Sequence, residues 1–295
     1  MELFNFLLKN LVQCVEEPEQ KIGRPRLRLG ESLFCTIGKV YSQLSSRRAH
    51  TLYREAKEKG QIDKAPNFNA INKFLNREDI TPLLHKLLVL SALPLKGLES
   101  TFALDSSGFR TNQFTQYAVQ KYNAKKEHKW IKAHIMCGTK TNVIVSVRIT
   151  KNNAGDSPQF APLVKETYEN GFEIKRIVAD RAYSSRDNYN LAEKIGAEAY
   201  IPFKPNATGT SKGSLMWKKM YHYFQLNQEK FMEHYHARSN VETTFMMVKT
   251  KFGDKLKSKS WISQQNELLC KFIAHNICVI IQEMMELGIN HILKQ

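Results

Sequence analysis

The chain has 295 residues, 42% of them hydrophobic, which is enough for one large domain or two smaller ones with a buried core. Its 44 Lys and Arg against 28 Asp and Glu give a formal net charge of +16, so a polyanionic partner is expected, although charge alone does not separate nucleic acids from acidic membranes. The five cysteines are scattered without a CxxC pair, which excludes a zinc ribbon or a disulfide framework and favours reduced thiols.

The hydropathy pattern predicts no membrane span. The most apolar stretch, Leu268 to Met285, contains five polar or charged residues and is expected to be a core helix. The first fifteen residues have neither a basic leader nor a small-residue cleavage site, so no signal peptide is expected. We therefore expect a cytoplasmic protein of a prokaryote that has no membrane partner. If it binds DNA, we expect it to be associated with the nucleoid.

Residues 1–98 are predicted to form a helical region. Short helices joined by tight turns resemble a helix-turn-helix unit, so this region is interpreted as a DNA-binding one. The expected helical segments are a short amphipathic stretch over Leu3–Val15, then Glu31–Leu44, Arg47–Lys59, a segment around Phe68–Leu75, and Ile80–Leu93.

Residues 99–295 are predicted to form a second domain, because the hydrophobic period changes at Ser100. An antiparallel start followed by strand–helix alternation predicts a mixed sheet with helices on its faces. A loop-rich insertion at about 203–228 and a long helical stretch over Asn227–Phe252 follow, and the chain ends in a helix from Ser263 to about Leu287. The expected sheet-region elements are strands at Ser100–Asp105, Trp130–Cys137, Val143–Ile149, Ile174–Asp180 and Glu198–Ile201, with helices at Ser157–Asn170 and Ser184–Ile195.

Three acids in this domain are candidate metal ligands. Asp105 and Asp180 each end a predicted strand, and Glu242 lies in the helical stretch after the sheet. Carboxylates from two strand ends and a neighbouring helix can converge on one point, where they suit Mg²⁺ and two-metal phosphoryl transfer. Taken singly, each Asp is better explained as a turn or cap residue and Glu242 as part of a solvated helix face.

The surroundings of Glu242 add a second pattern. Tyr235, Arg238, Glu242 and Lys249 fall on one face of a continuous helix at 100° per residue. An ordinary i,i+4 ion-pair face explains Arg238 and Glu242 equally well, so periodicity alone leaves both interpretations open.

The same residues resemble a known family. The spacing Tyr-two-Arg-three-Glu-six-Lys is similar to the Tyr-Arg-Glu-Lys signature of DDE-type transposases from bacterial and archaeal insertion sequences. The blocks Leu104–Phe109 and Val178–Tyr183 resemble the first-Asp and second-Asp blocks of that family, and Ile201–Asn206, Asn266-Glu267 and His275-Asn276 resemble its later segments. Arg181-Ala182 departs from the commonest pattern, in which Lys-Gly is frequent. The resemblance covers roughly Ser100 to Ile280.

The resemblance implies a ribonuclease-H-like fold with a mixed five-stranded sheet flanked by helices. It further implies that Asp105, Asp180 and Glu242 hold two Mg²⁺ or Mn²⁺ ions, with Tyr235, Arg238 and Lys249 as supporting residues near DNA phosphate. The implied partners are the terminal inverted repeats of an element and its target DNA, bound by a homodimer on paired ends.

Several basic, amide and aromatic residues are candidate DNA contacts. Arginines around Pro25 suit a minor groove, although a flexible charged linker is the commoner meaning of such a segment. Asparagines near residues 69–76 suit a major-groove recognition helix, with the polar face of a small bundle as the equal alternative. Trp217 among lysines suits base stacking or an ordinary core position equally, whereas Trp130 is expected in the core. The candidates are Arg24, Arg26, Arg28, Arg47, Arg48, Asn69, Asn72, Lys73, Trp217, Lys218 and Lys219.

Four functions compete. An active transposase, which cleaves element ends and transfers strands, explains all three acids together. A domesticated DNA-binding protein without chemistry is the second, and a ribonuclease-H-like nuclease that cleaves without joining is the third. A basic RNA-binding protein is the fourth, and it leaves the four-residue signature unexplained.

Overall fold

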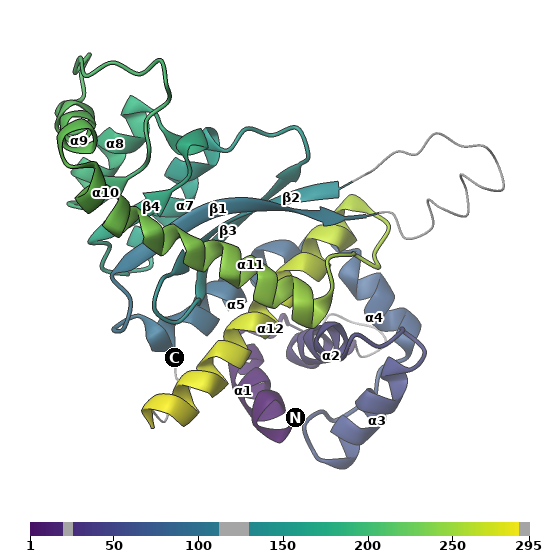
Figure 1. Cartoon of the computed structure of the whole chain (residues 1–295). Coiled ribbons are helices and arrows are strands. Elements are labelled where there is room, and N and C mark those ends of the chain that lie inside the picture. The colour runs from purple at the N-terminus through teal and green to yellow at the C-terminus, as the bar shows by residue number, and fades with distance from the viewer. Residues whose placement is uncertain (20–25, 112–129, 289–295) are drawn as a thin grey trace, which may run out of the picture. The chain divides into compact units, whose positions relative to one another are not determined.

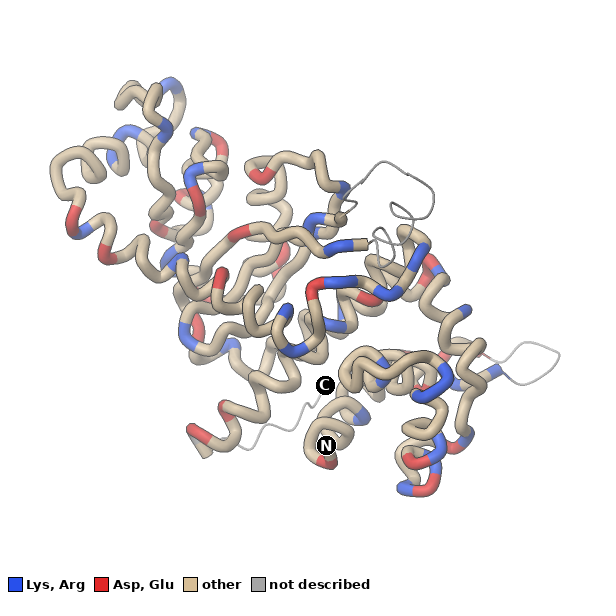
Figure 2. The backbone as a smooth tube through the Cα atoms, turned by 45° about the vertical axis from the view of Figure 1, so that its right-hand side comes forward, with Lys and Arg blue, Asp and Glu red and all other residues tan. Residues whose placement is uncertain are grey.

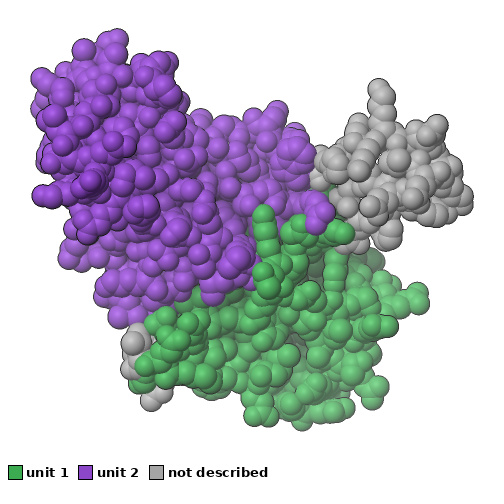
Figure 3. Space-filling view, viewed as in Figure 1, with its two compact units in different colours: residues 1–94, 111–126, 248–295 green, residues 95–110, 127–247 purple. Residues whose placement is uncertain are grey.

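The computed structural model describes residues 1–19, 26–111 and 130–288, which fall into two compact units. The helical unit contains Met1–Pro94 together with the described residues from Val248 onward, and the sheet unit contains Leu95–Arg110 together with the described residues up to Met247 (Figure 3). This division differs from the predicted boundary at Leu98, because the C-terminal part of the chain packs with the N-terminal helices. Basic residues are distributed over both units (Figure 2).

The helical unit is built around its last helix. α12 packs against α1, α2 and α5, and the core side chains of these helices are fully buried. Each predicted helix of this region is present to within a few residues. The bounds are α1 (Glu2–Gln13), α2 (Leu29–Ser42), α3 (Ala49–Glu58), α4 (Phe68–Leu75), α5 (Ile80–Ala92), the 3₁₀ turn η1 (Leu93–Leu95) and α12 (Trp261–Leu287) (Figure 1).

α12 is the one described helix that is long and apolar enough to cross a membrane by length and composition. However, 72% of its most apolar window is buried inside the structure. It therefore matches the core helix that the sequence predicts.

Two buried asparagines join α12 to its neighbours. The Asn266 side-chain amide donates to the carbonyls of Leu75 and Arg77, at 2.9 and 3.1 Å, and its Oδ1 accepts from the Thr81 hydroxyl at 2.8 Å. Further along, the Asn276 amide donates to Ser91 Oγ at 2.9 Å. Both side chains are fully buried, so they satisfy backbone and hydroxyl groups that water does not reach.

Asn266→Leu is expected to destabilise the protein by about 2–3 kcal/mol, because two carbonyls and a hydroxyl lose their partners in a dry site. Urea unfolding followed by circular dichroism measures the effect. Gln265→Leu, at the half-buried position beside it, is the matched control. A loss for Asn266→Leu no larger than that of the control would contradict this role.

The sheet unit contains a five-stranded mixed sheet in the order β3-β2-β1-β4-β5. β1 pairs antiparallel with β2 and parallel with β4, while β3 and β5 pair with β2 and β4 at the two edges. This is the predicted ribonuclease-H-like fold, a mixed sheet flanked by helices. The bounds are β1 (Thr101–Arg110), β2 (Trp130–Gly138), β3 (Ile144–Lys151), α7 (Ser157–Glu169), β4 (Arg176–Ala179), η2 (Arg181–Tyr183), α8 (Arg186–Lys194) and β5 (Glu198–Tyr200).

The two faces of the sheet carry different helices. The Thr167 hydroxyl of α7 contacts Met136 Sδ, whereas the Thr244 hydroxyl of α11 (Ser239–Phe252) contacts Cys137 Sγ. Since Met136 and Cys137 are consecutive residues of one strand, they point to opposite faces. α7 therefore covers one face and α11 the other.

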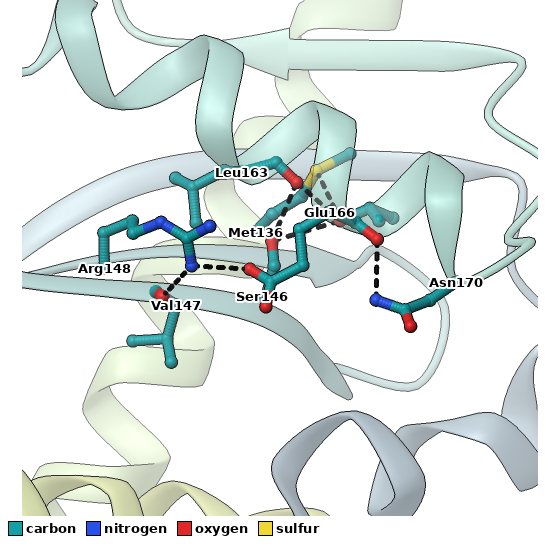
Figure 4. A network of polar contacts seen from close by, with 8 residues as sticks. Met136, Ser146, Val147, Arg148, Leu163, Glu166 and Asn170 are labelled. Atoms are coloured by element: carbon teal, nitrogen blue, oxygen red, sulfur yellow. Dashed lines mark hydrogen bonds and ion pairs between the residues drawn. The ribbon is translucent and has the colours of Figure 1, made fainter. Parts of the chain in front are cut away.

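Polar contacts fix α7 to the sheet (Figure 4). Arg148 of β3 pairs with Glu166 at 2.7 Å, and the Ser146 hydroxyl donates to the carbonyl of Leu163 at 3.1 Å. The Thr167 hydroxyl contacts Ser146 Oγ at 3.1 Å. These bonds lie on the face away from α11 and hold the sheet that carries the acids.

Three predicted elements differ from the structure. β1 continues five residues beyond Asp105, so this acid lies within a strand rather than at its end. The predicted long helix is divided into α10 (Gln228–Tyr235), the 3₁₀ turn η3 (His236–Arg238) and α11. The predicted loop-rich insertion contains a full helix, α9 (Leu215–Leu226), which Ser214 caps through the backbone N–H of Trp217 at 3.1 Å.

Candidate active site

Asp105 and Asp180 lie side by side on the α11 face of the sheet. The parallel pairing of β1 with β4 ends at Leu104 opposite Ala179, so the two acids follow as the next pair in register. Such neighbours project from the same face, about 4.8 Å apart between strands. Asp105 is paired with Ile135 of β2, two residues before Cys137, which places its carboxylate on the face that α11 covers.

The backbone orients both carboxylates. Asp105 Oδ1 accepts the N–H of Ser106, and Asp180 Oδ1 accepts the N–H of Arg181, each at 2.7 Å. Asp180 caps the short turn η2 in this way. The β1–β4 pairing ends one residue before both acids.

Arg238 joins the first acid to the third. Its guanidinium donates to Asp105 Oδ2 at 3.0 Å and to Glu242 Oε1 at 2.5 Å. The Arg238 and Asp105 side chains are 21% exposed, whereas Glu242 is 56% exposed. The Arg238 guanidinium therefore offsets the charge of both carboxylates.

The pKa of Asp105 is raised, first by burial and then by the nearby carboxylates of Asp180 and Glu242, while the Ser106 N–H and the Arg238 charge act in the opposite direction. Burial also raises the pKa of Tyr235, to which all three acids contribute. The Arg238 guanidinium lies 5.7 Å from the centre of the Tyr235 ring. The three acids, Tyr235 and Arg238 thus form one electrostatically coupled group.

Lys249 is placed differently from its signature partners. It lies two turns beyond Glu242 along α11, in the part of that helix that belongs to the helical unit. The 3₁₀ turn η3 also separates Tyr235 from the helix that carries Glu242. The predicted continuous helix is therefore interrupted, but the Arg238 guanidinium still lies 5.7 Å from the centre of the Tyr235 ring and forms the i,i+4 pair with Glu242.

Divalent ions suit the chemistry of this donor set, since three carboxylates supply hard oxygen ligands. Among the described residues, no group of three or more His, Cys, Asp or Glu side chains is arranged to hold a metal ion. Asp105 and Glu242 are instead paired with Arg238.

A buried polar group lies under Asp105, on the α7 face. His134 pairs with Ser106 in the ladder, contacts Thr150 Oγ1 at 2.9 Å and lies 3.2 Å from Asp156 Oδ1. Burial lowers the pKa of His134 to about 4, so its ring is neutral at pH 7. The alternation of β2 marks His134 as inward, but no local sequence pattern indicates Asp156 as its partner.

The basic candidates for DNA contact are mostly exposed. Arg28 pairs with Asp63 at 2.9 Å, and the Arg47 guanidinium lies 5.8 Å from the centre of the Phe68 ring. Arg24 lies outside the described residues. The remaining exposed candidates are Arg26, Arg48, Asn69, Lys73, Lys218 and Lys219.

Asn72 and Trp217, for which two interpretations were open, are structural residues, and Trp130 differs from expectation. Asn72 Oδ1 accepts from Lys39 at 2.9 Å and from Ser46 at 2.8 Å, which ties the side chain into the helical unit. Trp217 is 5% exposed, its Nε1 donates to the carbonyl of Thr208, and Arg186 covers its ring at 4.6 Å. This ring belongs to the core and is not open to base stacking. Trp130, expected in the core, is 41% exposed.

Comparison with known proteins identifies the family. The family model described as the transposase DDE domain matches residues 96–277, more than half of the chain. The chain belongs to the DDE transposase family. It is therefore a nucleic-acid-processing enzyme by family, and the match contains every residue of the Asp105–Asp180–Glu242 group.

Individual relatives are distant. The transposase is 22% identical over 279 residues to an uncharacterised protein of Aquifex aeolicus, a match that covers 90% of this chain and 82% of that protein. Among solved structures, it is similar to a piggyBac transposase synaptic complex with hairpin DNA, with 11% identity and a TM-score of 0.47 over 100% of this chain and 75% of the other.

Proposed function

We propose that this transposase cuts DNA at the ends of a mobile element and joins the freed ends to target DNA, using two divalent metal ions, Mg²⁺ or Mn²⁺. The observation that carries the proposal is the register of β1 and β4, which sets Asp105 and Asp180 beside each other on the face where Glu242 lies. Family membership supports the same interpretation.

Asp105, Asp180 and Glu242 are the proposed metal ligands. Ions held by these residues would supply the charge that activates the attacking water and stabilises the leaving oxygen at phosphorus. The water oxygen attacks the phosphodiester, and the bond to the 3′ oxygen breaks and leaves a 3′ hydroxyl. That hydroxyl then attacks a target phosphodiester, which exchanges one P–O bond for another.

The basic residues of the site have the complementary role. Arg238 is the proposed contact to a phosphate of the substrate. Its guanidinium already binds two carboxylates, and a DNA phosphate would replace them as an anionic partner. Tyr235, stacked near its guanidinium, is proposed to orient it. Lys249 is proposed to contact phosphate from the far end of α11.

Double-stranded DNA is the proposed partner, bound by a homodimer on paired element ends in the nucleoid of a prokaryotic cytoplasm. The net charge of +16 supports a polyanionic partner. The exposed arginines of the helical unit and the exposed face of α4 with Asn69 and Lys73 are the proposed contacts outside the active site.

A strand-joining assay tests the proposal. A labelled donor duplex carrying matched element ends, incubated with supercoiled plasmid and Mg²⁺, is expected to become covalently linked to the plasmid. Cleavage of the donor without joining would support the nuclease alternative instead. Donor binding with neither cleavage nor joining would support a DNA-binding protein without chemistry.

A further inference from the structure

The helical unit contains a polar cavity that the active site does not use. Its volume is about 430 Å³, and it is lined by the end of α2, the face of α4 with Asn72 and Asn76, and the loop from Gly253 to Ser260 that leads into α12. All of its lining residues belong to the helical unit. The loop is the yellow-green segment that follows α11 in Figure 1.

The loop presents its lysines in alternation. Lys255, Lys257 and Lys259 are exposed, whereas Leu256 between the first two is fully buried and Ser258 is half-buried. All three lysines line the cavity, as does Ser258, and the Lys257 ammonium donates to the carbonyl of Gln43 at the end of α2. Leu256 is fully buried and holds the loop on the core.

Two charged residues of α12, one turn apart, fix the loop backbone. The Glu267 carboxylate accepts the N–H groups of Lys257 and Ser258, the shortest at 2.8 Å. The Lys271 ammonium donates to the carbonyls of Gly253 and Lys255, both at 2.9 Å. Glu267 and Lys271 are buried, so the loop is held in place before any ligand arrives.

The lining carries a strong positive surplus. Five lysines and one carboxylate line the cavity, and that carboxylate, Glu267, is already occupied by backbone N–H groups. Burial lowers the pKa of Lys39 at the cavity wall, because its ammonium has lost water without gaining a full counter-charge. An anion in the cavity supplies that counter-charge.

Hydroxyl groups and a helix end complete the lining. Ser260 caps α12 by accepting the N–H of Ser263 at 3.1 Å, and its hydroxyl donates to Asn76 Oδ1 at 2.6 Å. The start of this 27-residue helix is therefore directed at the cavity and adds positive potential there. Lysines, hydroxyls and a helix N-terminus together suit phosphate oxygens.

We propose that this cavity is a binding site for the phosphodiester backbone of duplex DNA, gripped between the Lys255–Lys259 loop and the end of α4. The proposal rests on the proposed function, since it takes DNA as the partner. It assigns to the helical unit a phosphate contact that is distinct from Asp105, Asp180 and Glu242. Duplex DNA is the expected source of the phosphate, and a free anion is the competing one.

The test compares two triple variants of the full chain. Lys255→Gln, Lys257→Gln and Lys259→Gln are combined in the loop variant, and Lys57→Gln, Lys64→Gln and Lys86→Gln in the control. The control removes the same charge from exposed lysines of the same unit that do not line this cavity. Fluorescence anisotropy of a labelled 30-bp duplex in EDTA, over a range of NaCl concentrations, gives the affinity and its salt slope.

The loop variant is expected to lower the log–log salt slope by about 0.9 for each phosphate that the loop no longer neutralises, and the affinity at 0.1 M salt by roughly tenfold per phosphate. The log–log salt slope of the control is expected to differ from the wild-type slope by less than about 0.45, the value that corresponds to half of one phosphate. Lys→Arg at the three loop positions keeps the charge and is expected to restore the slope. Thermal unfolding of each variant confirms that it is folded.

Three outcomes overturn the proposal, and they are distinguishable. If wild-type protein binds DNA and the loop variant keeps the wild-type salt slope, the cavity is not a DNA-binding site, and the proposed function is unaffected. If the wild-type protein does not bind duplex DNA at all, both the cavity proposal and the proposed function are wrong. Calorimetric binding of inorganic pyrophosphate that disappears in the loop variant, with an unchanged DNA slope, makes the cavity a site for free anions.

Discussion

Asp180→Ala is expected to reduce Mg²⁺-dependent cleavage of an element end on the order of 10³-fold or more, because loss of one ligand removes several kcal/mol of charge stabilisation in the transition state. DNA affinity in EDTA is expected not to fall. Asp180 contacts the Arg181 backbone rather than a basic side chain, and removal of an anion reduces repulsion of DNA phosphates. Gel assays of cleavage and anisotropy measurements of binding check the two parts.

Asp187→Ala is the matched control, since Asp187 is an exposed acid in the first turn of the next helix. It is expected to cleave at the wild-type rate. Loss of DNA binding together with cleavage in Asp180→Ala would contradict the separation of phosphate binding from chemistry. Cleavage that survives in Asp180→Ala would remove this residue from the proposed metal site.

Arg238→Gln is expected to tighten Mn²⁺ binding in the absence of DNA by roughly tenfold, which corresponds to about 1.4 kcal/mol. In the structure the guanidinium contacts Asp105 and Glu242, so a metal ion must displace it before it gains both ligands. The magnitude is discounted because Glu242 is 56% exposed and water screens its charge. Calorimetry with Mn²⁺ measures the change.

The same substitution is expected to slow cleavage, because Arg238 is a proposed phosphate contact once DNA is bound. Opposite effects on metal affinity and on cleavage distinguish this role from simple damage to the fold. Arg176→Gln, an exposed arginine at the start of β4, makes the same charge change at the other end of the strand from Asp180 and is the control. Unchanged or weaker Mn²⁺ binding by Arg238→Gln would mean that the guanidinium does not compete with the ion.

The proposed function gives Arg238 two sets of partners. In the structure, the guanidinium contacts the carboxylates of Asp105 and Glu242, and burial together with the neighbouring carboxylates raises the pKa of Asp105. Under the proposed function, a DNA phosphate would offer Arg238 another anion, and the acids would become available to metal ions. Substrate and metal binding are then expected to support each other, which ties assembly of the reactive site to the presence of DNA.

Much of the fold could be predicted from local pattern. The helices of residues 1–98 and the alternation of strand and helix after Ser100 are confirmed, and Asp180 does follow the last residue of its strand. Local sequence is sufficient here because each element has a clear hydrophobic period and a breaker or cap at its end. The sequence indicates Asn266 and Asn276 only through their resemblance to the family. In the structure, Asn266 joins α12 to α4, and Asn276 joins α12 to α5.

The remaining features depend on tertiary context. β1 extends past Asp105 because β2 continues to pair with it as far as Trp130, which no local pattern around Asp105 reveals. The helical period continues smoothly across residues 235–240, so nothing in it indicates the 3₁₀ turn that contains Arg238. Trp217 lies among lysines in sequence, and only the positions of Tyr189 and Phe203 show that its ring is buried.

The division into units is also a tertiary property. Residues from Val248 onward follow the sheet domain without a composition change, but their apolar faces match α1, α2 and α5. The basic loop before α12 therefore belongs with α4 in the helical unit. A linear assignment of DNA binding to the N-terminal region and chemistry to the rest misses this arrangement.

The central claim is that Asp105, Asp180 and Glu242 form a metal-dependent phosphoryl-transfer site. The most direct measurement is cleavage of a labelled duplex carrying the element end, with Mg²⁺ and with EDTA, by the wild-type protein and by Glu242→Ala. We predict cleavage by the wild-type protein in Mg²⁺ alone and none by Glu242→Ala in either condition. Tight DNA binding by the wild-type protein without cleavage in Mg²⁺ or Mn²⁺ would contradict the claim and leave a DNA-binding protein without chemistry.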